Sequence, residues 1–106
     1  MKIPKNLSRS GFCNHDVPEW IDEERINNIV YVIRPIFKKI KSINYRVSSY
    51  GIKHDVERRM GHYVSNGELI ASMIVLGFEY KRPTGSAGIN CYFNVSMKSL
   101  KLICNG

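Results

Sequence analysis

The apolar positions between Asp16 and Lys41 recur at steps of three and four residues, the spacing of one buried helical face. They are Ile26, Ile29, Val30, Ile33, Phe37 and Ile40. The pattern predicts a helix that begins near Asp16, where Glu19 follows at capping-box spacing. Pro35 lies inside the pattern and removes a backbone donor, so it should kink this helix or divide it in two.

Two further helices are predicted in the middle of the chain. The first covers about residues 49–60, has a serine cap and stops at Gly61. The second follows Ser65, which forms a capping box with Glu68, and runs to Leu76. The second helix is apolar nearly all round, which indicates a buried core helix.

Alternating apolar residues predict a strand over 89–96, after a shorter strand over 78–82 and a turn-rich segment between them. Cys91, Phe93 and Val95 should face inward and Tyr92 and Asn94 outward. Residues 97–106 fit either a short helix or one more strand.

The order of helix, tight turn, helix and hairpin is the order that a winged helix-turn-helix requires. We therefore expect an α+β, winged-helix-like domain over residues 16–106, built from a kinked first helix, a helix-turn-helix and a β-hairpin. Residues 1–15 show little periodicity, and we expect them to form an extended or poorly ordered flexible arm.

Positive charge is concentrated in the second part of the chain. The formal net charge is +7, made up of −1 for residues 1–33 and +8 from Arg34 onward. Such an excess fits a polyanionic partner, because neutralising phosphates releases counterions. It equally fits an acidic protein partner, or a solvated face that keeps the protein in solution.

A set of basic and aromatic residues on the predicted outer faces forms the candidate binding patch. Its members are Lys38, Lys39, Lys41, Arg46, Tyr50, Lys53, His54, Arg58, Arg59, Lys81, Arg82 and Tyr92. Most of the other tyrosines and phenylalanines should lie in the core.

The helix after Ser65 is poorly suited to reading bases. A recognition helix presents Arg, Lys, Asn or Gln to the major groove. This helix offers only Asn66, Glu68 and Ser72, and Glu68 would repel phosphate. The patch could bind the backbone of a nucleic acid through shape and charge, without recognising the base sequence.

The sequence contains no motif for catalysis or for a cofactor. Cys13, His15, His54, His62, Cys91 and Cys104 lack the spacing of a zinc site, and three scattered cysteines do not form a disulfide framework. No apolar run is long enough to span a membrane, and no signal peptide is recognised. We expect a cytoplasmic protein that is not an enzyme, holds neither metal nor cofactor and has no membrane partner.

Three segments resemble a group of small uncharacterised proteins of phages, prophages and plasmids. They are SYGIKH from Ser49, YVSNGELI from Tyr63 and NCYFN from Asn90. The resemblance covers about residues 40–100. It implies a mobile-element protein that meets host machinery, and it carries over no site residue.

The leading hypothesis is a non-enzymatic phage or mobile-element protein that binds a host nucleoprotein complex, as a stoichiometric inhibitor of the anti-CRISPR type. The alternative is a winged-helix transcriptional regulator, which would bind nucleic acid at its own operator as a homodimer. An operator binder should prefer one DNA sequence, whereas an inhibitor should ignore DNA sequence.

Overall fold

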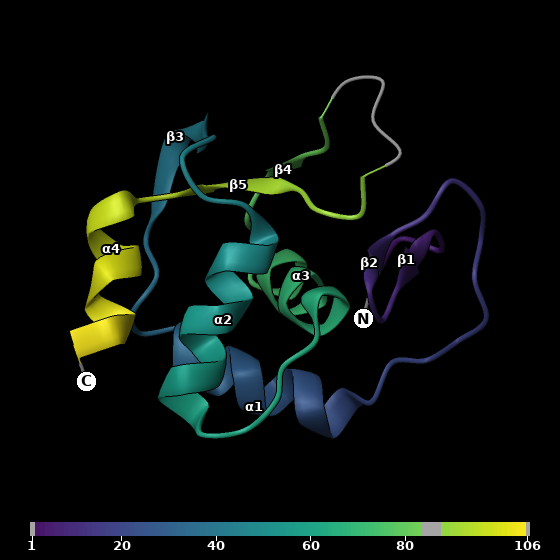
Figure 1. The fold of residues 1–106 in the computed structure, drawn as a ribbon, viewed down its shortest axis with the longest axis horizontal. Helices are drawn as coiled ribbons and strands as arrows, with labels where there is room; N and C mark the ends of the chain where they lie inside the picture. Colours follow the sequence, from purple (N-terminus) through teal and green to yellow (C-terminus); the bar gives the residue numbers. More distant parts are fainter. Residues whose placement is uncertain (1, 84–87, 106) are drawn as a thin grey trace.

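The computed structural model describes residues 2–83 and 88–105 and shows an α+β fold (Figure 1). The helices are α1 (Glu23–Ile33), α2 (Ser49–Met60), α3 (Asn66–Val75) and α4 (Met97–Leu102), and a 3-10 turn over Ile103–Asn105 follows α4. The strands are β1 (Leu7–Ser8), β2 (Gly11–Phe12), β3 (Lys39–Asn44), β4 (Tyr80–Lys81) and β5 (Tyr92–Val95). None of the described helices has the length and apolar character needed to cross a membrane.

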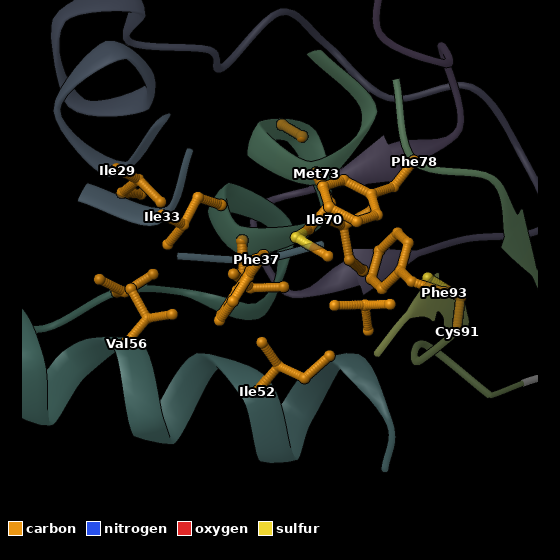
Figure 2. Packing of buried hydrophobic residues seen from close by; sticks show 14 of the residues in the cluster. Ile29, Ile33, Phe37, Ile52, Val56, Ile70, Met73, Phe78, Cys91 and Phe93 are labelled. Carbon is orange, nitrogen blue, oxygen red and sulfur yellow. The ribbon is translucent and has the colours of Figure 1, made fainter. Parts of the chain in front are cut away.

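Helix α3 lies at the centre of the fold. Figure 1 shows it nearly end-on, with α1 below it, α2 on one side, the β1–β2 hairpin on the other and β4 and β5 above. All its residues from Asn66 to Met73 are buried, which confirms the prediction of a core helix. Figure 2 shows the core that surrounds it, in which Ile33 of α1, Ile52 of α2 and Phe93 of β5 converge on Ile70 of α3.

The three-stranded sheet has the order β3-β5-β4, and both pairs of neighbours are antiparallel. Asn94 of the central strand joins the other two. Its side-chain nitrogen donates to the carbonyl of Ile40 at 3.1 Å, and its side-chain oxygen accepts from the N–H of Glu79 at 2.7 Å. The amide therefore bridges all three strands, which explains why Asn94 is buried although the alternation predicted an outward position.

The predicted bounds of α2 and the predicted start of α3 are confirmed, and α3 ends at Val75, one residue before the predicted Leu76. Ser48 is the N-cap of α2, although its side chain makes no capping hydrogen bond within the described residues, and Gly61 ends that helix with a left-handed φ of 78°. Ser65 Oγ accepts from the N–H of Glu68 at 3.1 Å, and the Glu68 carboxylate accepts from the N–H of Ser65 at 2.9 Å. These reciprocal bonds satisfy helix donors that would otherwise be unpaired at a buried helix end.

The prediction for the first helix is wrong at both ends. The helix begins at Glu23, because the Asp22 carboxylate accepts from the N–H groups of Glu24 and Arg25 at 3.1 and 3.3 Å. It ends at Ile33, shortly before Pro35, and no second helical half follows. A turn over residues 34–36 follows instead, and Lys39–Asn44 form β3, which pairs with β5.

Residues 2–15 do not form a loose arm. Leu7 and Phe12 belong to the hydrophobic core, with 1% and 2% of their surface exposed. The carbonyl of Arg9 accepts from the N–H of Gly67 at 2.8 Å, and Trp20 Nε1 donates to the carbonyl of Leu7 at 2.6 Å. Leu7 and Phe12 are too few to form a periodic pattern in the sequence. Their burial nevertheless packs the β1–β2 hairpin against α3.

The C-terminal segment adopts the helical alternative. Ser96 caps α4 by accepting from the N–H of Ser99 at 2.9 Å, and Ser99 Oγ in turn accepts from the N–H of Lys38 at 3.0 Å. This contact fastens α4 to the start of β3.

Candidate binding surface

Lys53 is buried and already has its partners. Its ammonium group lies 2.7 Å from a carboxylate oxygen of Glu57 on the next turn of α2, and the residue is only 5% exposed. The same nitrogen lies 5.2 Å from the ring centre of Tyr50 and 4.7 Å from that of Tyr63. The cation is enclosed by groups of its own chain and is therefore not available to an external partner.

Glu57 connects this group to the loop before α3. Its carboxylate accepts from the N–H of Val64 at 3.2 Å and lies 3.4 Å from His54 Nδ1. Burial alone would raise the pKa of Glu57, but the hydrogen bonds from Lys53 and Val64 outweigh it and the pKa is lowered. His54 also packs edge-on against Tyr50, with the ring centres 4.6 Å apart.

The two arginines of α2 also have partners within the protein. Arg58 pairs with Asp55 on the same helix, although its side chain remains largely exposed. Arg59 donates to the carbonyl of Ile103 at 3.4 Å. The basic face predicted on α2 is therefore largely neutralised by acidic residues of the same helix.

Arg82 holds the end of β4 against the N-terminal hairpin. It donates to the carbonyls of Cys13 at 3.4 Å and Gly88 at 3.3 Å, and its guanidinium carbon lies 4.9 Å from the ring centre of Phe12. Neighbouring Lys81 is exposed.

The predicted patch retains an exposed basic edge on and beside β3. Lys38, Lys39, Lys41 and Arg46 are exposed, and none of them forms an ion pair with any residue in the described part of the chain. We call these four residues the basic edge, because β3 is one of the two outer strands of the sheet.

An aromatic pair lies beside the basic edge. The rings of Tyr45 and Tyr92 are 5.3 Å apart in a tilted arrangement, and Tyr45 is 59% exposed. Tyr50 is also exposed, at 48%. The structure therefore places Tyr92 near the basic edge and Tyr50 with the enclosed Lys53.

The expectation that most other aromatics lie in the core is wrong for the tyrosines and right for Phe78 and Phe93. Tyr31 is 83% exposed and Tyr63 is 64% exposed. Ile29 and Ile33 are four residues apart and lie on one side of the helix, whereas Tyr31, midway between them in the sequence, lies on another side. This position could have indicated that Tyr31 is exposed. Tyr31, Arg34 and Tyr45 are exposed residues that the predicted patch did not include.

The first turns of α3 are covered. Asn66 donates through its side chain to the carbonyl of Ser10 at 3.0 Å and to the side-chain oxygen of Asn90 at 2.9 Å. A side chain at Gly67 would overlap the carbonyl oxygen of Ser8. This end of the helix is covered and therefore could not enter a groove of DNA.

Glu68 is likewise engaged within the fold. Its carboxylate accepts from Arg25 of α1 at 2.5 and 3.1 Å and from the N–H of Ser65. Burial would raise the pKa of Glu68, but the bonds from Arg25 and Ser65 prevail and lower it. The carboxylate joins α1 to α3.

The cysteine and histidine side chains of the described residues do not belong to any cluster of potential metal ligands. Among residues 2–83 and 88–105, no group of three or more His, Cys, Asp or Glu side chains is placed to hold a metal ion. Cys91 is fully buried, and burial raises the pKa of its thiol to about 12.

Comparison of the chain with protein-family models, with curated proteins and with solved structures gave no match.

Proposed function

We propose that this chain is a non-enzymatic phage or mobile-element protein that binds host nucleic-acid machinery in the host cytoplasm and inhibits it stoichiometrically, as an anti-CRISPR does. The observation that carries the proposal is the contrast between a buried α3 and an exposed basic edge. The helix best placed to read DNA is enclosed, whereas Lys38, Lys39, Lys41 and Arg46 are exposed.

The element order supports a winged-helix-like ancestry. The order α1, β3, α2, α3, β4, β5, with β5 between β3 and β4, agrees with a helix-turn-helix followed by a hairpin. In that architecture α3 would be the recognition helix, and the segment between β4 and β5 would be the wing. Because the β1–β2 hairpin covers this helix, we infer that the protein has a winged-helix-like arrangement of elements but does not use α3 to recognise bases.

The charge distribution favours contact with an acidic surface. Lys53 and Arg58 of α2 pair with carboxylates of the same helix, whereas none of the four cations of the basic edge forms an ion pair with a described residue. Exposed cations of this kind steer association and specify a complementary partner. A nucleic-acid mimic or an acidic face of a nucleoprotein complex has the required charge.

The experiment is a pull-down of the tagged protein from host lysate, with and without nuclease, analysed by mass spectrometry. We expect a defined host complex that survives nuclease treatment. Recovery of DNA-associated material alone, lost on nuclease treatment, would replace the proposal with the operator-binding regulator. In that case the purified protein should also be a dimer and prefer one DNA sequence.

A further inference from the structure

A shallow hollow lies where the end of α1, the end of α3 and the start of β3 meet. Phe37 and Phe78 form its floor, and both are buried in the core. Val30 of α1 and Val75 and Leu76 at the end of α3 form its apolar sides. We call this feature the α1–α3 hollow.

The rim of the α1–α3 hollow is basic. Arg34, Lys38 and Lys39 line it together, and no acidic residue does. All three are exposed, and none forms an ion pair with another described residue. The ammonium group of Lys39 lies 5.6 Å from the ring centre of Phe78, so positive charge stands directly beside an aromatic floor.

A large aromatic side chain extends the apolar surface along α1. Tyr31 and Pro35 line an adjoining depression that shares Val30 and Arg34 with the α1–α3 hollow. Tyr31 is the most exposed of the large hydrophobic residues in the described part of the chain, at 83%. Exposed tyrosines of this kind are frequent anchors of protein interfaces, because they add contact area with few torsions to order.

We propose that the α1–α3 hollow binds an acidic segment of a protein partner, with a large apolar side chain of that segment on Val30, Val75 and Leu76 and its carboxylates on Arg34, Lys38 and Lys39. This inference rests on the proposed function and names the chemistry of the partner. The Tyr31 ring packs beside the bound segment.

The combination of exposed apolar sides and an exposed basic rim selects this occupant. A purely apolar segment would remove three cations from water without a counter-charge, which is costly. A phosphodiester backbone would neutralise the cations but leave Val75 and its apolar neighbours in contact with water, which forfeits the apolar burial. An acidic segment with an apolar anchor satisfies both parts of the surface.

The test selects random peptides displayed on phage against the purified protein and against variants of the rim and the anchor. The rim variant is Lys38→Glu with Lys39→Glu, and the anchor variant is Tyr31→Ser. The matched control is Lys2→Glu with Lys5→Glu, which makes the same charge change at two exposed positions outside the hollow. Circular dichroism and a thermal melt verify that every variant is folded.

We expect the enriched peptides to carry several Asp or Glu residues beside an aromatic or aliphatic residue. The best of them should bind the rim and anchor variants about thirtyfold more weakly, the loss expected of a central interface residue. The control should bind as the wild type does. No enrichment, peptides without acidic excess, or equal binding to the rim variant would overturn the proposal.

The same variants separate this inference from the proposed function. If the wild type captures a nuclease-resistant host complex and the rim variant captures it equally well, the hollow is not the docking site, although the proposed function stands. If the wild type captures no such complex, the proposed function itself is wrong.

Discussion

Gly67→Ala tests whether the β1–β2 hairpin is seated on α3. An alanine Cβ at this position would lie 2.0 Å from the carbonyl oxygen of Ser8 and 2.7 Å from that of Arg9. Both are backbone atoms, so the clash cannot be relieved by a side-chain rotation. The hairpin must move away from the helix.

The cost follows from what the hairpin buries. Full loss of the burial of Leu7 and Phe12 would cost roughly 3–6 kcal/mol, at about 1.5–3 kcal/mol for each side chain. If the hairpin stays in place and the core is overpacked, the cost is about 1–3 kcal/mol. The better helix propensity of alanine stabilises α3 by about 1 kcal/mol and offsets part of either cost. We expect a net destabilisation of about 2–4 kcal/mol if most of the hairpin burial is lost.

Urea unfolding followed by circular dichroism measures this loss, and Gly51→Ala in α2 is the matched control. A Cβ at Gly51 meets only a methyl group of Val47, at 2.9 Å, so this substitution should change stability by about 1 kcal/mol or less. Trypsin should also cleave after Arg9 faster in Gly67→Ala than in wild type. If Gly67→Ala is as stable as Gly51→Ala and Arg9 stays protected, the seating of the hairpin on α3 is refuted.

Two further predictions concern buried titratable groups. The lowered pKa of Glu68 means that its contacts stabilise the fold above the unfolded-state pKa of about 4.3 and are lost as pH falls through the lower folded value. Glu68→Gln should therefore be less stable than wild type at pH 7, by about 2 kcal/mol in urea unfolding, and the gap should narrow toward pH 3; an unchanged gap would contradict the role of the carboxylate. Iodoacetamide at pH 8 should modify the exposed Cys104 in the native protein but Cys91 only after unfolding, as mass spectrometry of the digest can show; modification of native Cys91 would contradict its burial.

Local signals in the sequence were sufficient for α2 and α3. Ser65 and Glu68 form a capping box within four consecutive residues, and Gly61 terminates a helix through its own backbone freedom. Each signal acts over one turn and needs no partner elsewhere in the chain. The buried position of α3 followed from its apolar composition.

Elements that depend on distant partners were not predictable in the same way. The apolar spacing of Phe37 and Ile40 continues that of α1, yet Lys39–Asn44 is a strand because it pairs with β5, about fifty residues later. Leu7 and Phe12 carry no periodic signal, and only contacts with distant parts of the chain, such as α3 and Tyr80, make them core residues.

The candidate surface shows the same division. The predicted patch correctly included Lys38, Lys39, Lys41 and Arg46, because lysines and arginines are mostly exposed in folded proteins. It could not separate Lys53 from them, since the enclosure of Lys53 depends on a carboxylate one turn away and a tyrosine on the following loop. Tyr31 was missed because composition alone assigns aromatic residues to the core.

The most direct test compares the wild type with the Lys38→Glu, Lys39→Glu variant in pull-downs from host lysate with and without nuclease. The Lys2→Glu, Lys5→Glu variant serves as the control. We expect wild type and control to recover the same host complex after nuclease treatment and the rim variant to lose it. Recovery that depends on intact DNA in all three proteins would contradict the account.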